Sequence, residues 1–60
     1  MSAAFDEAYD LVGTVTTYEN KDYKTKRLKA LELKITDEDE RRHYAELWEA
    51  FIVESNVNAP

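Results

Sequence analysis

Residues 23–35 read Tyr-Lys-Thr-Lys-Arg-Leu-Lys-Ala-Leu-Glu-Leu-Lys-Ile, and the conformation of this stretch decides the fold of the chain. Its second half alternates: an extended segment would place Leu31, Leu33 and Ile35 on one face and charged side chains on the other. Such alternation is typical of a half-buried β-strand. A strand would also supply an apolar surface on which a following helix could dock. We therefore predict a strand over Tyr23–Ile35.

The first half of this stretch does not keep the alternation. Leu28 and Ala30 have the opposite parity, and one extra residue between Leu28 and Leu31 would restore the phase, so we expect a β-bulge there. A helix is the alternative. Lys24–Lys34 consists almost wholly of good helix formers, and Leu28, Leu31 and Ile35 fit a helical period.

The residues before this stretch favour a hairpin. Asp10–Tyr18 is rich in β-branched and aromatic residues, and we predict a first strand there. Glu19–Asp22 is a polar interval of hairpin length. Ser2–Ala8 is compatible with a helical turn, on which Phe5 and Tyr9 would form an apolar pair.

The clearest element is a C-terminal helix over Glu38–Glu54. Its apolar stripe has helical spacing and comprises Tyr44, Leu47, Trp48, Phe51 and Ile52. Asp37 can cap the helix, and Glu40 stands three residues later, as in a capping box. The elements together predict an α+β fold, ββα, in which one C-terminal helix packs on a two-stranded antiparallel hairpin that dimerisation could extend. We expect one small domain over residues 1–55 and a disordered tail over 56–60.

The charge of the chain is segregated. The formal net charge is −5 at pH 7, yet residues 23–34 carry five basic residues and one acid. A net polyanion has little general affinity for nucleic acid, so we expect no direct nucleic-acid binding. It can instead compete with nucleic acid for a basic protein surface. A chain of 60 residues without cysteine has no disulfide to stabilise it, and we expect it to form a homodimer.

Enzymatic chemistry is poorly supplied. His43 is the only histidine, and nothing in the sequence specifies a nucleophile for it to activate. The consecutive acids Asp37–Glu40 diverge around a helix instead of converging on a metal ion. We predict no catalytic residue, no metal site and no cofactor. The first residues have neither the basic nor the apolar region of a secretion signal, and no apolar run is long enough to span a membrane. We therefore expect a soluble, cytoplasmic protein that does not contact a membrane.

We predict instead a small interaction protein that binds, and inhibits, a basic or nucleic-acid-binding protein. The predicted partner-binding residues are the acids of the helix start and the tyrosines beside the hairpin turn: Asp37, Glu38, Asp39, Glu40, Tyr18 and Tyr23. Arg27 and Lys29 form a basic face that could guard a strand edge or meet the acids of a second protomer. Two alternative functions are a nucleic-acid-binding module that uses this basic strand and a self-assembling structural or accessory subunit.

Three short motifs resemble one known family. They are Phe5-Asp6-Glu7-Ala8-Tyr9-Asp10-Leu11, Lys21-Asp22-Tyr23 and Lys29-Ala30-Leu31-Glu32-Leu33. They are similar to the opening, the hairpin return and the second strand of the small uracil-DNA glycosylase inhibitors encoded by Bacillus phages. The resemblance covers about half of the chain and implies an acidic, dimeric DNA mimic. The family's inhibitory residues do not carry over, because Thr25 replaces its strand glutamate and the charged run Glu38–Arg42 replaces its early helix aromatics.

Overall fold

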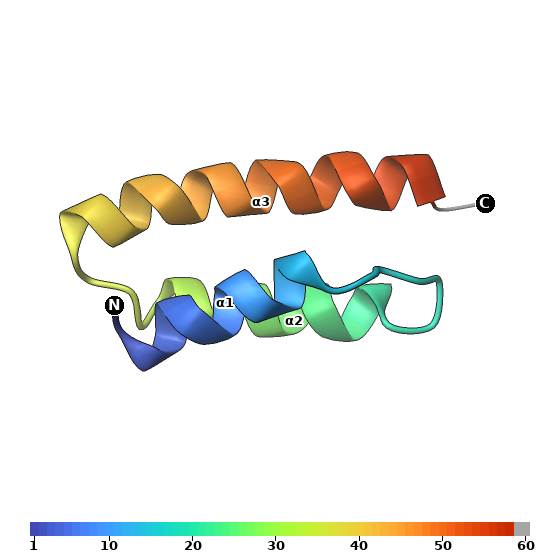
Figure 1. Ribbon diagram of the computed structural model, residues 1–60. Coiled ribbons are helices and arrows are strands. Elements are labelled where there is room, and N and C mark those ends of the chain that lie inside the picture. Colours follow the sequence, from blue (N-terminus) through green and yellow to red (C-terminus); the bar gives the residue numbers. More distant parts are fainter. Residues whose placement is uncertain (59–60) are drawn as a thin grey trace.

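The computed structural model describes the backbone of residues 1–58 and the side chains of residues 1–56. This part of the chain forms three helices, α1 (Ala3–Gly13), α2 (Lys21–Glu32) and α3 (Glu38–Asn58). α1 packs against both of the other helices, and the long α3 runs alongside the pair (Figure 1). The N-terminus and the start of α3 lie at one end of the bundle, and the loop between α1 and α2 lies at the other end.

The predicted α+β fold is wrong, because no strand occurs among residues 1–58. The predicted first strand, Asp10–Tyr18, is divided between the end of α1 and the loop that follows it. Most of the predicted second strand lies in α2, so the predicted bulge between Leu28 and Leu31 is absent as well. The hairpin that the phage-inhibitor resemblance implies is likewise missing from the described residues.

The second segment is helical because its buried positions follow a helical period. Leu28, Leu31 and Ile35 are 0%, 1% and 1% exposed, whereas Leu33, which alternation would bury, is 83% exposed. Lys24, one turn before Leu28, completes the buried face. Lysine, arginine, leucine, alanine and glutamate all favour a helix, so local propensity and burial agree on this conformation.

α1 begins with a side-chain cap and extends the predicted helical turn. Ser2 is the N-cap residue, and its Oγ accepts a hydrogen bond from the Phe5 amide at 3.2 Å. The helix continues to Gly13 and buries Phe5 and Ala8 against the other helices. Tyr9, predicted to pair with Phe5, lines the same groove as Phe5 and is 61% exposed.

A buried lysine holds the loop between α1 and α2. Lys24 is 4% exposed. Its Nζ donates hydrogen bonds to the Thr14 carbonyl at 2.9 Å, the Thr14 hydroxyl at 2.8 Å and the Val15 carbonyl at 3.2 Å. The Thr16 amide donates to Glu54 of α3 at 2.9 Å, and this bond lowers the pKa of the Glu54 carboxyl. α2, through Lys24, and α3, through Glu54, therefore anchor this loop, whose β-branched residues had suggested a strand.

The predicted C-terminal helix is confirmed, and it starts at Glu38 as expected. The predicted cap is also present, because Asp37 Oδ2 accepts a hydrogen bond from the Glu40 amide at 3.0 Å. The Glu40 side chain, however, binds Ser2 at the start of α1 and not the Asp37 backbone. This bond joins two helix starts in place of closing a capping box within one helix.

α3 extends beyond the predicted end at Glu54 and reaches Asn58. Residues 56–58 of the predicted tail therefore belong to α3. Residues 59 and 60 of that tail lie outside the described residues.

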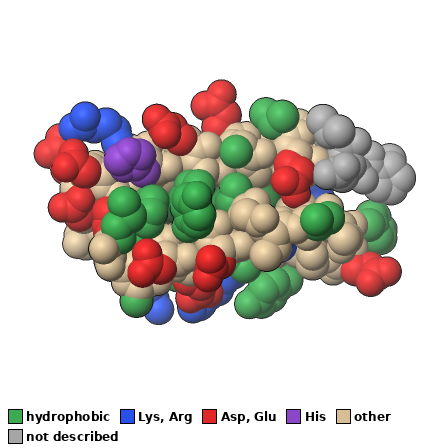
Figure 2. All heavy atoms as spheres, viewed as in Figure 1, with side chains coloured by type: hydrophobic (Ala, Val, Ile, Leu, Met, Phe, Trp, Pro, Cys, Tyr) green, Lys and Arg blue, Asp and Glu red, His purple; other side chains and the backbone are tan. Residues whose placement is uncertain are grey.

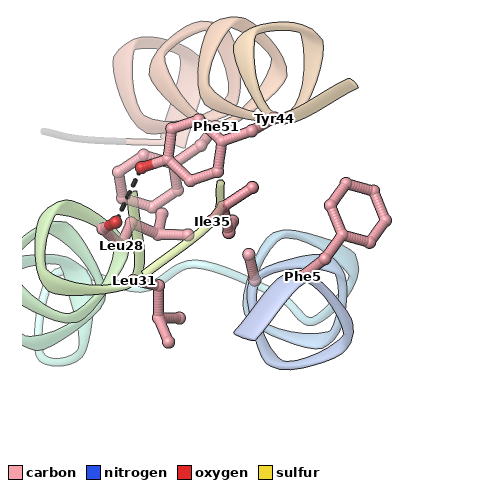
Figure 3. Close-up of a cluster of buried hydrophobic side chains, with 7 residues drawn as sticks. Phe5, Leu28, Leu31, Ile35, Tyr44 and Phe51 are labelled. Atoms are coloured by element: carbon pink, nitrogen blue, oxygen red, sulfur yellow. Dashed lines mark hydrogen bonds between the residues drawn. The ribbon is translucent and has the colours of Figure 1, made fainter. Parts of the chain in front are cut away.

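The three helices share one core. The buried hydrophobic residues are Phe5, Ala8, Leu28, Leu31, Ile35, Tyr44 and Phe51. Figure 3 shows that they come from all three helices and the α2–α3 connection, with Leu28, Ile35, Tyr44 and Phe51 close together. The Tyr44 hydroxyl donates a hydrogen bond to the Leu28 carbonyl at 2.7 Å. Burial, assisted by the nearby Glu32 carboxylate, raises the pKa of Tyr44 to about 12.

We expect the substitutions Leu28→Ala and Leu33→Ala to separate the helical fold from the strand alternative. Leu28→Ala leaves a cavity in the core and should lower the free energy of unfolding by about 2–5 kcal/mol. Leu33→Ala removes the same atoms from an exposed position and should cost less than about 0.5 kcal/mol. Urea unfolding followed by circular dichroism measures both values. Equal losses in the two variants would contradict the observed burial of this segment.

Candidate functional site

The acidic start of α3 is partly used to hold the fold together. Glu40 is 7% exposed, and its carboxylate accepts hydrogen bonds from the Ser2 amide at 2.6 Å and the Ser2 hydroxyl at 2.8 Å. Asp37 caps the helix. Glu38 and Asp39 are exposed, and Asp39 lies 3.7 Å from Arg42 in a surface ion pair. Of the four acids predicted to bind a partner, Glu38 and Asp39 are the ones that do not hold the fold together, since Asp39 makes only this surface pair.

The structure does not bring the predicted tyrosine anchors to the acids. Tyr18 lies in the loop between α1 and α2, and Tyr23 lies in the first turn of α2. Both are exposed, at 78% and 61%. The loop and the first turn of α2 lie at the end of the bundle opposite to residues 37–40 (Figure 1).

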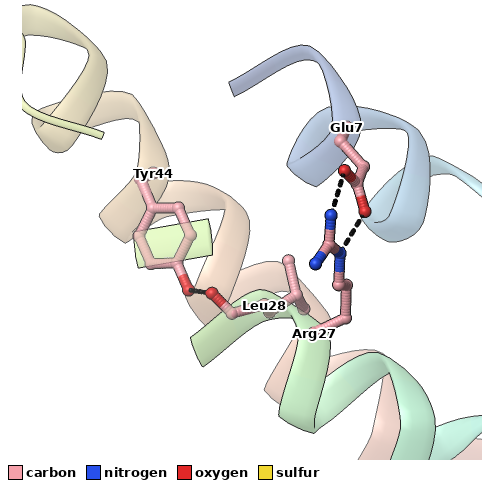
Figure 4. Close-up of polar contacts among 4 residues, drawn as sticks. All are labelled: Glu7, Arg27, Leu28 and Tyr44. Atoms are coloured by element: carbon pink, nitrogen blue, oxygen red, sulfur yellow. Dashed lines mark hydrogen bonds and ion pairs between the residues drawn. The ribbon is translucent and has the colours of Figure 1, made fainter. Parts of the chain in front are cut away.

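The predicted basic face is divided as well. Arg27 forms a two-pronged ion pair with Glu7 of α1, in which Nε donates to Oε2 and Nη2 donates to Oε1 at 2.8 Å (Figure 4). This pairing lowers the pKa of the Glu7 carboxyl and raises the pKa of the Arg27 guanidinium. Lys29 has no carboxylate within 4.0 Å among the described residues and lies beside α3. Arg27 is thus occupied within the fold, which weakens the alternative of a nucleic-acid-binding surface.

A groove between α1 and α3 brings together side chains that the sequence did not group. It has a volume of about 540 Å³. Its apolar and aromatic lining consists of Met1, Phe5, Tyr9 and Leu47. Its polar lining consists of Asp6, Asp10, His43 and Glu46. We call these eight residues the acidic groove, and Figure 2 shows hydrophobic side chains along this face with acidic side chains on both sides of them.

The carboxylates of the acidic groove are available to a partner. Asp6 and Asp10, one turn apart on α1, and Glu46 on α3 form no ion pair within the described part of the chain. Tyr9 lies between the two aspartates in sequence and is 61% exposed. The groove therefore combines three free negative charges with an exposed aromatic ring, the mixture that favours a cationic amphipathic partner.

A second hollow continues the acidic groove toward the start of α3. It shares Met1 and His43 with the acidic groove, and its other lining residues are Ser2, Asp37, Asp39 and Glu40. The acids predicted from the sequence are therefore one end of a longer acidic surface. The additional residues were missed because Asp6 and Asp10 share a helical face only if α1 extends to Gly13, where a strand was predicted.

His43, the only histidine of the chain, lines both hollows. His43 is exposed, and its ring meets the Phe5 ring edge-on with the centroids 6.4 Å apart. Among the described residues, no group of three or more histidine, cysteine or acidic side chains could hold a metal ion. Within the same range, none of the helices has the length and apolar character needed to cross a membrane.

Comparison of the chain with known protein families, with curated proteins and with solved structures finds no match. The fold defines the class of this protein as a small acidic three-helix bundle. Its function must be inferred from its own grooves and charges.

The two glutamates with lowered pKa values predict a loss of stability in acid. In the folded state, the pKa values of Glu7 and Glu54 lie below the ordinary value of 4.5. Each carboxylate therefore stabilises the fold above pH 4.5. This stabilisation is lost as the pH falls through the lowered pKa. The double variant Glu7→Gln, Glu54→Gln should therefore be less stable at neutral pH and should show a flatter decline below pH 4.5.

Urea unfolding at a series of pH values tests this expectation. The matched control, Glu19→Gln with Glu49→Gln, changes two exposed glutamates that form no ion pair within the described residues. A decline as steep in the Glu7, Glu54 variant as in the control would show that these two carboxylates do not contribute to the acid sensitivity.

Proposed function

We propose that this protein is a non-enzymatic interaction module that binds a basic, amphipathic segment of another protein in the acidic groove. The observation that carries the proposal is the set of three unpaired carboxylates, Asp6, Asp10 and Glu46, beside the exposed ring of Tyr9. A neutral apolar groove would select no charge, and an acidic surface without apolar lining would bind weakly and without a defined register.

The chemistry of the groove suggests a helical ligand. Amphipathic helices dock in grooves between helices by inserting apolar residues spaced one turn apart. Tyr9 and Leu47 offer apolar contacts to such residues, while the carboxylates of α1 and α3 can pair with lysine or arginine at the edges of the ligand helix. The charges also steer the encounter, because they lie on a chain whose net charge is −5.

A basic amphipathic segment is a common means by which a protein contacts nucleic acid. A module that covers such a segment would compete with the nucleic acid and inhibit the partner. This retains the function predicted from the sequence and centres it on the acidic groove, which Asp39 extends. The cytoplasmic location predicted from the sequence is part of the proposal, and the absence of cysteine is compatible with that compartment.

Removal of groove charges should weaken the binding of a synthetic amphipathic helix made of leucine and lysine. Asp6→Asn with Glu46→Gln should reduce the affinity by about 2- to 30-fold, because each exposed ion pair contributes about 0.2–1 kcal/mol. Glu19→Gln with Glu49→Gln makes the same change in net charge outside the groove and should have a smaller effect.

Fluorescence anisotropy of a labelled peptide, measured at low and high salt, gives these affinities. Equal losses in the two double variants would mean that the peptide senses only the overall charge and does not occupy the groove. An affinity that is independent of salt would remove the electrostatic basis of the proposal.

Self-association is a further part of the proposal. Large apolar side chains remain exposed on the described part of the chain, among them Tyr9, Val15, Tyr18, Tyr23 and Leu33. Burying some of them between two copies would stabilise a domain whose own core is small. Light scattering over a range of concentrations should therefore show a dimer. A monomer at every concentration would contradict the dimer, and large assemblies would favour the structural-subunit alternative.

A further inference from the structure

A second groove lies between α2 and α3 and has a different character. Its volume is about 450 Å³, and its lining residues are Lys29, Glu32, Arg41, Tyr44, Ala45 and Trp48. We call these six residues the basic groove. None of them lines the acidic groove, so whatever binds here is independent of the function proposed above.

The basic groove lies where Ala45, a small residue, is surrounded by longer side chains of α3. Arg41, Tyr44, Ala45 and Trp48 occupy one stripe of α3, at the spacing of residues that share a helical face. Ala45 presents only a methyl group between its longer neighbours and is exposed. A larger side chain at this position would fill the space without touching the core.

The aromatic walls of the groove are held in place by the core. The Trp48 ring packs on the buried Phe51 ring, with their centroids 5.7 Å apart. The Tyr44 hydroxyl is bonded to the Leu28 carbonyl and Tyr44 is only 5% exposed, so Tyr44 supports the groove and Trp48 is the ring that a ligand can reach. Both rings are therefore fixed before a ligand arrives, which reduces the entropy cost of binding.

The charged side chains of the groove have a net positive charge. Lys29 and Arg41 have no carboxylate within 4.0 Å among the described residues. Arg41 Nη1 donates a hydrogen bond to the Ile35 carbonyl at 3.1 Å, which positions the guanidinium and leaves other N–H groups for a ligand. Glu32 contributes one negative charge at the same groove. The two cations and one anion together favour a ligand with a single negative charge.

We propose that the basic groove binds a small aromatic carboxylate, with its ring against Trp48 and its carboxylate paired with Arg41 and Lys29. Arginine recognises a carboxylate through two parallel hydrogen bonds, and an aromatic wall adds ring stacking. The volume lies within the range for small-molecule sites. Glu32 disfavours ligands with a second negative charge.

Trp48 is the only tryptophan of the chain, so its fluorescence reports directly on this groove. Phenylacetate is the probe, because it carries the ring and the carboxylate and does not absorb light that excites indole selectively. It should cause a saturable change in Trp48 fluorescence. Acetate, which lacks the ring, and 2-phenylethanol, which lacks the charge, should each bind at least about tenfold more weakly, the factor that a loss of 1.4 kcal/mol produces.

Two substitutions on α3 separate groove binding from general effects. Ala45→Leu fills the groove with a residue of similar helix propensity and should abolish the response. Ala50→Leu is the matched control, because Ala50 is also exposed on α3 but does not line this groove. Lys29→Gln should weaken phenylacetate binding and leave 2-phenylethanol unaffected. Circular dichroism checks that each variant retains its helical content.

The proposal is overturned if phenylacetate causes no saturable change in the wild-type protein, or if Ala45→Leu binds it as well as Ala50→Leu does. It is also overturned if 2-phenylethanol binds as tightly as phenylacetate, because the cations then play no part. Because Lys29 and Ala45 lie outside the acidic groove, these variants should still bind the basic peptide normally. A failure of one proposal is therefore distinguishable from a failure of the other.

Discussion

Burial of Leu28, Leu31 and Ile35 is the constraint on which the rest of the bundle depends. All three side chains are at most 1% exposed, and full burial of such a residue contributes about 1.5–3 kcal/mol. They belong to one core cluster with Phe5 of α1 and Phe51 of α3. A domain of this size buries only about 60% of the surface of its unfolded chain, so the loss of one such contact affects all three helices.

Charged side chains complete the fold at both ends of this core. At the loop end, the Lys24 ammonium is buried but fully bonded to loop oxygens, and Glu54 accepts the Thr16 amide. At the other end, Glu40 joins the start of α3 to Ser2 at the start of α1. Buried charges are tolerated when they are hydrogen-bonded in this way. Their use inside the fold leaves a smaller set of charges to meet partners.

α3 separates two grooves of opposite character. Toward α1, carboxylates surround exposed apolar side chains, and this arrangement supports a basic protein segment as the ligand. Toward α2, Lys29 and Arg41 line a groove together with Trp48. This arrangement supports a small anionic molecule as the ligand. Both grooves use residues that are distant in sequence: Asp6 and Glu46 share a groove because α1 packs on α3, which no local pattern reveals.

The sequence by itself determined the acidic charge, the last helix and its cap at Asp37, because these depend on composition and on residues within one or two turns of each other. It could not decide between a strand and a helix in residues 23–35, since Leu31 and Ile35 fit both. The burial of Lys24 and Leu28 and the exposure of Leu33 distinguish the helix. Tertiary structure alone decided that Lys24 and Glu40 are interior and that Asp6 and Glu46 face a common groove, because these outcomes require contacts between helices.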